Sequence, residues 1–305
     1  MSERKALLIL HGKQALNEEV RAAVEGKRQE GWELAVRLTW EAGDAQRCVA
    51  EALSAGYTQL IAGGGDGTLR DIAEALAAHP NQASLVLMPL GTANDFARAA
   101  GVPLAPAQAL ELLDTVPHAI DLGDVGGQVF LNMATGGFGS QVTANTSEDL
   151  KKIIGGAAYL FTGLSRFSEL HAAYGELQGP DFYWRGELLA LGIGNGRQAG
   201  GGHELCPEAL VDDGLLDISI LPAPQEVVGT LKNLLADGFG IDNMFVRARL
   251  PWVEIKVSEG LHINLDGEPL EGDNLRFSAR AAALRVHLPE NSPLLSASLA
   301  VNRPD

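Results

Sequence analysis

The stretch Gly63-Gly64-Gly65-Asp66-Gly67-Thr68 separates a short apolar segment, residues 59–62, from a segment with helical spacing, residues 69–78. Clustered glycines let backbone N–H groups approach a large anion without Cβ clashes. A helix that begins near Thr68 turns its positive dipole end toward the same point. Asp66 adds a carboxylate, a ligand that Mg²⁺ prefers. We interpret this turn as a triphosphate-binding loop. The alternative is a plain strand-to-helix turn capped by the aspartate, which needs fewer glycines.

A second turn of the same type follows one strand later, at Pro89-Leu90-Gly91-Thr92-Ala93-Asn94-Asp95-Phe96-Ala97. Thr92 can cap the helix predicted over 93–100 and can also donate its hydroxyl to phosphate. Alone, this segment is an ordinary capped helix. However, ligands of open α/β sheets bind at the edge where the carboxyl ends of the strands meet. The two turns are therefore expected to line one cleft.

The first 120 residues alternate between strand-like and helix-like segments, as judged by apolar runs and by 3.6-residue spacing. The predicted strands are 5–10, 33–39, 59–62 and 84–88, and the predicted helices are 17–30, 44–55 with Asp44 as the cap, 69–78 and 93–100. Such alternation indicates an α/β domain with a parallel sheet and helices on its faces.

The second half of the chain, after a glycine cluster at residues 123–127, is predicted to be β-rich, as a sandwich or layered sheet. Its predicted strands are 129–134, 186–194, 215–221, 253–257, 261–265 and 284–288, and its two predicted helices are 147–170 and 224–236. The first of these helices is apolar on more than one face, which favours burial between domains over a groove for acyl chains or a surface that dips into a bilayer, although burial is compatible with either. The predicted domains are residues 1–125, 126–295 and a tail at 296–305.

The net charge of −16 restricts the possible partners. Nucleic-acid binding is dominated by Lys and Arg contacts to phosphate, so a nucleic-acid partner is not expected. The net negative charge also disfavours attraction to anionic membranes. No stretch approaches the roughly 20 apolar residues that a membrane span needs. We expect a soluble, cytoplasmic protein.

The two motifs, GGGDGT followed by PLGTANDFA, resemble those of the diacylglycerol kinase catalytic-domain superfamily. The whole chain, including Leu38-Thr39-Trp40-Glu41, is most similar to the YegS-type bacterial lipid kinases. The resemblance implies a nucleotide domain like those of NAD kinases and 6-phosphofructokinases, a β-rich second domain, ATP as co-substrate with Mg²⁺, and a lipid acceptor reached by transient contact with a membrane surface. It also implies a set of nucleotide-binding residues, namely Thr39, Gly63, Gly64, Gly65, Asp66, Gly67, Thr68, Leu69, Arg70, Asp71, Thr92 and Asn94. Relatives carry an Asn-Pro-x-x-Gly-like stretch where this chain has His11-Gly12-Lys13, which leaves Lys13 available to phosphate.

Two further features receive a role through the resemblance. By its spacing, Asp266-Gly267-Glu268-Pro269 is a hairpin turn with solvated charges. The general base of the family is the glutamate of such a turn, which implies that Glu268, together with Asp66, is catalytic. By its spacing, the Asp212-Asp213-Gly214 segment is also a turn. The matching loop of the family holds a second cation, Mg²⁺ or Ca²⁺, through a carboxylate and backbone carbonyls, which implies that the ligands are Leu210, Asp213 and Leu215.

The leading hypothesis is therefore a lipid kinase acting on a diacylglycerol-like lipid, a phospholipid head group or a long-chain base. A kinase of a soluble acceptor such as NAD shares the GGDG core, but it usually shows an Asn-Glu pair where this chain has Asn94 and Asp95. A nucleotide-binding regulator without activity is a third hypothesis, and the presence of both Asp66 and Glu268 argues against it.

Overall fold

The computed structural model describes residues 4–136, 173–199, 202–223, 245–257 and 263–296. The chain forms two compact units, each built from separate stretches of sequence. We name them the N-terminal unit (residues up to 122, 210–214, and from 280 onward) and the β-rich unit (123–209 and 215–279). The helices predicted over 147–170 and 224–236 lie outside the described residues.

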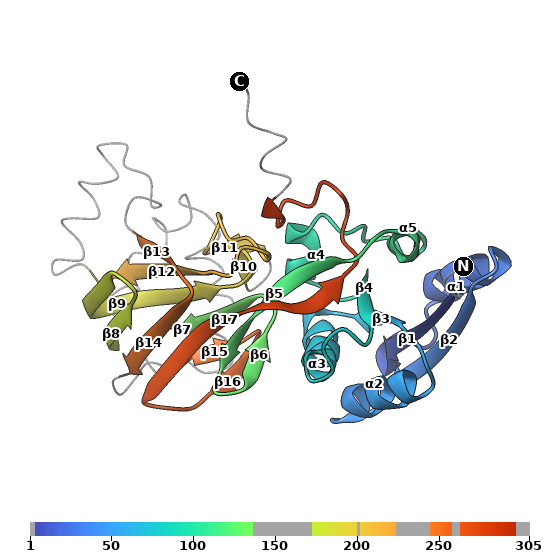
Figure 1. Ribbon diagram of the computed structural model, residues 1–305, viewed down its shortest axis with the longest axis horizontal. Coiled ribbons are helices and arrows are strands. Elements are labelled where there is room, and N and C mark those ends of the chain that lie inside the picture. The colour runs from blue at the N-terminus through green and yellow to red at the C-terminus, as the bar shows by residue number, and fades with distance from the viewer. Residues whose placement is uncertain (1–3, 137–172, 200–201, 224–244, 258–262, 297–305) are drawn as a thin grey trace, which may run out of the picture. The chain divides into compact units, whose positions relative to one another are not determined.

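The N-terminal unit is built on parallel strands in the order β4-β3-β1-β2 (Figure 1). These strands are β1 (Lys5–His11), β2 (Glu33–Thr39), β3 (Gln59–Gly64) and β4 (Ser84–Pro89). Their register aligns His11 with Thr39 and Gly64 with Pro89, so the strands end together at one edge. We name it the carboxyl edge. The end of β17 (Asn274–Val286) pairs in parallel with β4 through Val286 and Leu85.

The central strands form because their side chains are apolar on both faces. β1 has five consecutive buried residues and β4 has six, the pattern of a parallel sheet that is covered on both sides. Helix α1 packs with α5, and α2 packs with α3. Since parallel crossovers are right-handed, this strand order places α1 on one face and both α2 and α3 on the other.

Helices α1 to α4 begin close to their predicted starts, with corrections at their first residues, whereas α5 was not predicted. The helices are α1 (Glu18–Gln29), α2 (Asp44–Ser54), α3 (Asp66–Ala77), α4 (Asp95–Ala99) and α5 (Pro106–Glu111), with 3-10 turns η1 (Gly12–Gln14) and η2 (Leu112–Asp114). Asp44 was predicted to cap α2 but is its first residue, because Gly43 takes the cap position in the left-handed region. The α3 helix begins at Asp66 rather than near Thr68, since the backbone is still extended at Gly65.

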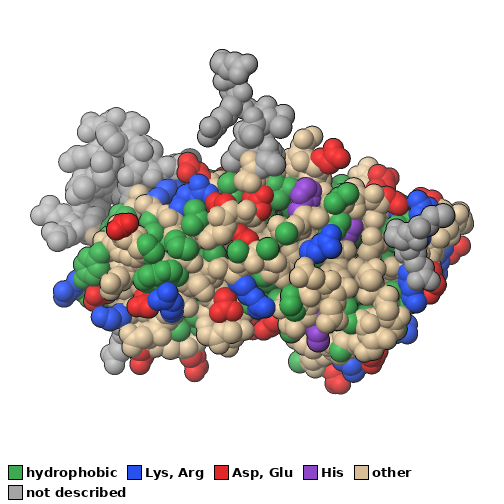
Figure 2. Space-filling view, in the orientation of Figure 1, with side chains coloured by type: hydrophobic (Ala, Val, Ile, Leu, Met, Phe, Trp, Pro, Cys, Tyr) green, Lys and Arg blue, Asp and Glu red, His purple; other side chains and the backbone are tan. Residues whose placement is uncertain are grey.

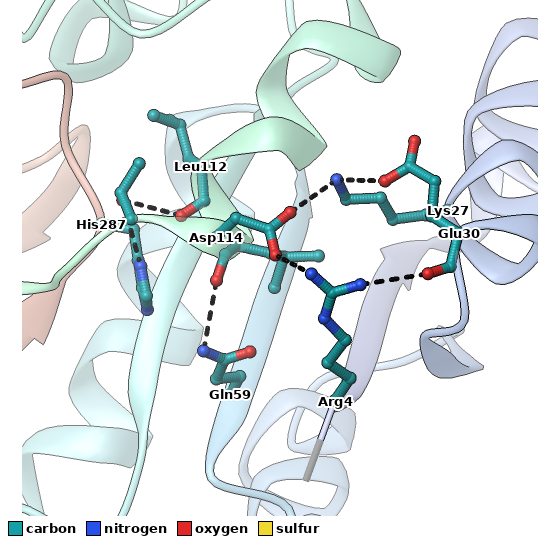
Figure 3. Close-up of polar contacts among 9 residues, drawn as sticks. Arg4, Lys27, Glu30, Gln59, Leu112, Asp114 and His287 are labelled. Carbon is teal, nitrogen blue, oxygen red and sulfur yellow. Dashed lines mark hydrogen bonds and ion pairs between the residues drawn. The ribbon is translucent and has the colours of Figure 1, made fainter. Parts of the chain in front are cut away.

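A polar network closes the opposite, amino-terminal edge of this sheet (Figure 3). The Lys27 ammonium lies 2.9 Å from an Asp114 carboxylate oxygen and 2.8 Å from a Glu30 oxygen. Arg4 reaches the other Asp114 oxygen at 3.4 Å. The Lys27 side chain is only 6 % exposed, so its charge is tolerated there because two carboxylates pair with it.

A second polar group at the same edge surrounds His287, which is fully buried. Its Nε2 lies 2.8 Å from the Ser84 hydroxyl, and its Nδ1 lies 3.4 Å from the Thr115 hydroxyl. Burial lowers the pKa of His287 to about 4, so the imidazole is neutral at pH 7. Ser84 is the first residue of β4, so this Ser–His pair lies at the end of the sheet away from the glycine turns. We therefore interpret the pair as part of the packed core.

The β-rich unit is an antiparallel arrangement of strands in the order β16-β15-β7-β9-β8-β14-β17, with β12 pairing with β9 and β13 (Figure 1). Its strands are β6 (Gln128–Phe130), β7 (Met133–Gly136), β8 (Ala173–Gly179), β9 (Phe182–Gly194), β10 (Gln198–Ala199), β11 (His203–Glu204), β12 (Leu216–Pro222), β13 (Val246–Leu250), β14 (Trp252–Val257), β15 (Ile263–Leu265) and β16 (Glu268–Leu270). Strands β5 (His118–Val125) and β17 contribute residues to both units. The core includes Phe130 and Phe277, whose rings meet edge to face at 6.2 Å.

One predicted strand is wrong in this unit. Residues 129–134 form two strands, β6 and β7, separated at Leu131 and Asn132. The N–H groups of these two residues donate to the Asp266 carboxylate instead of to a neighbouring strand. The break is therefore caused by a side chain more than 130 positions away.

Candidate active site

The carboxyl edge of the N-terminal unit gathers the loops that follow β1, β2, β3 and β4. Strand β1 lies between β2 and β3, so the connection from β1 to β2 and the connection from β2 to β3 run in opposite directions across the sheet. In open α/β sheets the ligand crevice lies at such a switch point, outside the carboxyl ends of the strands. Both glycine turns identified in the sequence start at this edge.

The two glycine turns touch each other through their backbones. Leu90 N–H donates to the Gly64 carbonyl at 2.8 Å. A Cβ placed on Gly91 would lie 2.6 Å from the Gly65 Cα, and one placed on Gly64 would lie 2.4 Å from the Thr68 hydroxyl oxygen. A side chain on Gly91 would therefore push the two turns apart, and one on Gly64 would displace Thr68 within its own turn. The predicted meeting of the two motifs at one place is thus observed.

Asn94, rather than Thr92, takes the cap position of α4, which corrects the predicted cap. The backbone of Asn94 is left-handed, with φ 51°. Its amide bridges both backbone groups of Gly91, accepting from the N–H at 2.9 Å and donating to the carbonyl at 2.8 Å. The side chain that was expected among the nucleotide ligands is therefore engaged in holding the second turn. Thr92 is exposed at the tip of that turn.

Asp66 is the titratable group at the centre of this edge. Its Oδ1 accepts a 3.4 Å hydrogen bond from the Phe96 N–H, which links the two turns again. Burial raises the pKa of the Asp66 carboxyl, and the negative charge of buried Asp95 adds to the effect. Two carboxylates that repel each other in a partly buried place favour a divalent cation, which offsets both charges.

The remaining residues of the predicted nucleotide set differ in their exposure. Thr39 ends β2 and is half-buried, and a Cβ on Gly12 would lie 2.6 Å from its carbonyl oxygen. Leu69 is buried, and its N–H donates to the Gly65 carbonyl at 3.0 Å, so this residue serves the core and the first turn of α3. Arg70 pairs with Asp71 at 2.7 Å.

Asp266 and Gly267 form a two-residue hairpin turn between β15 and β16, in the β-rich unit, and β16 begins at Glu268. Asp266 and Gly267 both have positive φ, 46° and 95°, as a type I′ turn requires. The Asp266 carboxylate accepts hydrogen bonds from the N–H groups of residues 131–133, the shortest at 2.7 and 2.8 Å. Glu268 is the exposed first residue after this turn. Asp266 was not among the predicted site residues, and only its Asp-Gly turn signature pointed to this position.

The loop at 210–214, which carries two of the three residues predicted for a second cation, is fixed by Asp121 in the N-terminal unit. Asp121 is buried; its carboxylate accepts from the N–H of Gly214 at 2.6 Å and from that of Ala282 at 2.8 Å. Asp212 accepts from the N–H and the hydroxyl of Ser296, both at 2.9 Å. In the described ranges no three Asp, Glu, His or Cys side chains gather as a metal-binding group. A cation at this loop would therefore rely on carbonyl oxygens beside Asp213. Oxygen donors of this kind fit a hard cation.

Parallel strands that end in two apposed glycine turns, followed by a β-rich unit, have the fold class of diacylglycerol kinase-type phosphotransferases. Two sequence families match the chain: the diacylglycerol kinase catalytic domain over residues 5–125, and the YegS C-terminal NAD kinase beta sandwich-like domain over residues 133–288. The chain belongs to this family of diacylglycerol kinase-type proteins. The predicted family, fold class and kinase class are confirmed.

Similar proteins agree with this membership. A protein of Pseudomonas fluorescens (strain Pf0-1), named "Probable lipid kinase YegS-like", is 84 % identical over 305 residues and covers 100 % of both chains. A protein of the same name from Pseudomonas aeruginosa (strain PAO1) is 70 % identical over 97 % of this chain and 98 % of its own. In fold, the chain resembles the crystal structure of "a putative diacylglycerol kinase from Bacillus anthracis str. Sterne", with a TM-score of 0.75, 23 % identity, and coverage of 95 % of this chain and 96 % of the other.

Proposed function

We propose that the protein transfers the γ-phosphoryl group of ATP to a hydroxyl group of a lipid. Its family membership makes it a lipid kinase, and such kinases use ATP with a divalent cation. The observation that carries the proposal is the backbone contact between the two glycine turns at the carboxyl edge. A Cβ on Gly91 would collide with the Gly65 Cα at 2.6 Å, one on Gly65 would lie a tight 3.2 Å from the Gly91 Cα, and an N–H-rich turn at a helix start accepts phosphate.

In this assignment the N-terminal unit binds the nucleotide. Backbone N–H groups of residues 65–68 hold the phosphates, and the hydroxyl groups of Thr39 and Thr92 add donors. Asp66, beside Asp95, holds Mg²⁺, which neutralises phosphate charge when it is bound. The donor set of carboxylates and phosphate oxygens suits that ion.

Glu268 is assigned as the general base. Its carboxylate takes the proton of the acceptor hydroxyl while that oxygen forms a bond to the γ-phosphorus. The bond from this phosphorus to the β–γ bridging oxygen breaks, and ADP leaves. Such a base contributes about 10²–10⁴-fold to the rate. The exposed side chain of Glu268 and the tightly bonded turn before it are suited to that role, because the turn limits where the carboxylate can lie.

The second cation is assigned to the loop of Leu210, Asp213 and Leu215, as Mg²⁺ or Ca²⁺. Asp121 accepts from the N–H of Gly214 in this loop and from the N–H of Ala282, and so fixes the loop in place. The role assigned to such a cation is structural, since it would hold the loop.

The acceptor is assigned as a lipid bearing a free hydroxyl, met by transient contact with a membrane surface. On the face drawn in Figure 2, Lys and Arg side chains are interspersed with Asp and Glu, and the described residues form no extended basic patch on it. Among the described residues, no helix has the length and apolar character that crossing a bilayer requires. Neutral or zwitterionic lipids are therefore better suited to this face than anionic ones.

The test is transfer of labelled γ-phosphate from ATP and Mg²⁺ to mixed micelles that carry a panel of lipids, beside a soluble panel that includes NAD. Glu268→Gln is compared with Glu271→Gln, which changes an exposed glutamate three positions later. We expect labelled lipid from the native protein and from Glu271→Gln, and a loss of about 10²-fold or more for Glu268→Gln with ATP affinity unchanged.

Two results would overturn the proposal. Labelling of a soluble acceptor alone would make the protein a kinase of small molecules. Binding of ATP without transfer to any acceptor would make it a nucleotide-binding regulator. A Glu268→Gln variant as active as Glu271→Gln would remove the base assignment and leave the kinase intact.

A further inference from the structure

Trp40 is the most exposed large apolar side chain among the described residues, at 92 %. An indole left in water forfeits the stabilisation of burial, which for a full-sized apolar side chain is substantial. The other tryptophan of this unit, Trp32, is buried at 6 % exposure. The exposure of Trp40 therefore indicates that its side chain contacts a ligand or a partner molecule.

The backbone that carries Trp40 is held firmly. The Asp44 Oδ2 atom accepts hydrogen bonds from the N–H of Trp40 at 2.7 Å and from that of Glu41 at 3.1 Å. Its other oxygen pairs with Arg47 at 2.7 Å. The Arg47 guanidinium, followed by these N–H groups, lowers the pKa of Asp44 to about 2, so the clamp stays charged across the physiological range. The exposed indole is thus presented from a fixed turn.

The turn lies on the carboxyl edge, beside the nucleotide site. Trp40 directly follows Thr39, the last residue of β2. Strand β1 separates β2 from β3, and neighbouring strands are spaced by about 4.8 Å, so the end of β2 lies about 10 Å from the end of β3. A nucleoside triphosphate with its phosphates on the turn after β3 can span that distance and bring its base to the end of β2.

Between these two points the chain has a glycine, Gly12, which carries no side chain. Where β1 ends, Gly12 packs on the Thr39 carbonyl, so that a Cβ would lie 2.6 Å from the oxygen. The ends of β1 and β2 are therefore in backbone contact, and no side chain stands between them at Gly12. Gly12 itself therefore presents no side chain to a ribose at this position.

We propose that the indole of Trp40 is the stacking surface for the purine base of the nucleotide, with the phosphates on residues 65–68 and the ribose over Gly12. The inference rests on the proposed kinase function, whose nucleotide site it completes. It assigns Trp40 as a nucleotide-binding residue that distinguishes a nucleoside triphosphate from bare polyphosphate. Stacking of a base on an aromatic side chain contributes about 1–3 kcal/mol, which corresponds to roughly 5- to 150-fold in affinity.

The test compares Trp40→Ala and Trp40→Phe with Val116→Ala in the full-length protein. Val116 is an exposed apolar side chain of the same unit, next to Thr115 at the amino-terminal edge. The dissociation constants of Mg²⁺-ATP and of Mg²⁺-tripolyphosphate are measured by calorimetry. We expect Trp40→Ala to weaken ATP binding about 10-fold or more and to leave tripolyphosphate binding unchanged. Trp40→Phe retains most of the ATP affinity, and Val116→Ala retains all of it. In the kinase assay, Trp40→Ala raises the KM for ATP and leaves kcat nearly unchanged.

Fluorescence gives an independent readout. ATP, but not tripolyphosphate, is expected to quench the emission of the native protein and to shield it from acrylamide, and Trp40→Phe abolishes both effects. Equal ATP affinity in Trp40→Ala, or an equal loss for tripolyphosphate, overturns the inference. So does a blue shift of the Trp40 emission on neutral lipid vesicles without nucleotide, because the indole would then be a membrane contact. If the native protein transfers phosphate to no lipid while ATP still quenches Trp40, the kinase function fails and the stacking role stands.

Discussion

Gly67 offers a direct test of where the phosphates bind. It is the second residue of α3, it is exposed, and a Cβ placed on it meets no atom within 4 Å. The free protein therefore has room for Gly67→Ala. Alanine is favoured over glycine in a helix by up to about 1 kcal/mol, so the free energy of unfolding should stay the same or rise by that amount. If phosphate oxygens rest against this backbone, the added methyl group occupies their place.

The expected loss of affinity follows from overpacking. Inserting a methyl group into a close contact costs about 1–3 kcal/mol, so the dissociation constant of ATP should rise roughly 5- to 150-fold. Stability is measured by urea unfolding, and affinity by calorimetry with a non-hydrolysable ATP analogue. Two controls bracket the result. Gly26→Ala in α1 also meets no atom and should leave the affinity unchanged, whereas Gly91→Ala collides with Gly65 and should lower both stability and affinity. A Gly67→Ala protein that binds ATP as the native protein does would refute the close approach of phosphate to this turn.

Two further predictions concern Asp266 and His287. Asp266→Ala removes the acceptor for the backbone N–H groups of 131–133, so it should cost about 3 kcal/mol or more of unfolding free energy and lower kcat by freeing the turn before Glu268. Asp266→Asn keeps an acceptor and tolerates positive φ, so its unfolding free energy and its kcat should lie between those of Asp266→Ala and the native protein. Urea unfolding measures the first quantity and the lipid kinase assay the second. The pKa of His287 is lowered from 6.5 to about 4. Between these two values, His287 is protonated in the unfolded chain and neutral in the folded chain. Its contribution to stability is complete above pH 6.5 and is lost as the pH falls toward 4, which amounts to about 2 kcal/mol between pH 7.5 and pH 5. His287→Gln should reduce the pH dependence of the unfolding free energy by that amount.

Each of these expectations has a clear contrary outcome. Native kcat in an Asp266→Ala protein that has lost stability would show that the turn does not position the base. For His287, a pH dependence as steep in His287→Gln as in the native protein would assign the loss of stability to other groups.

The local pattern of the sequence was sufficient for strands β1 to β4 and helices α1 to α4 of the N-terminal unit, whereas α5 and β5 were not predicted. Buried apolar runs predict β1, β3 and β4, and residues 63–68 predict the turn that follows β3, because strand burial and glycine clustering are properties of neighbouring residues. Helix starts were less accurate. The first helical residue depends on which backbone conformation the turn adopts, as Gly43 and Gly65 show.

The contacts that hold the site together could not be read from the sequence. The Asp266 carboxylate accepts hydrogen bonds from the N–H groups of residues 131–133, and the Asp121 carboxylate accepts from those of Gly214 and Ala282. These contacts span 93 to 161 positions in the sequence. Nothing local distinguishes such an aspartate from a solvated turn residue, since its partners are backbone N–H groups that every residue carries.

By itself, then, the sequence determined the family of this protein and predicted the chemistry proposed for it: a glycine turn with Asp66 that suits a triphosphate, and a glutamate in an Asp-Gly-Glu turn whose proposed role comes through the family that the motifs identify. Only the tertiary structure decided which groups are free to act. It engages Asn94 in bonds to Gly91, buries Leu69, and leaves Trp40 in water at the edge where the turns meet. The reason is physical. A residue's type sets what it can bind, whereas its exposure and the groups already bonded to it depend on segments that meet only in the folded chain.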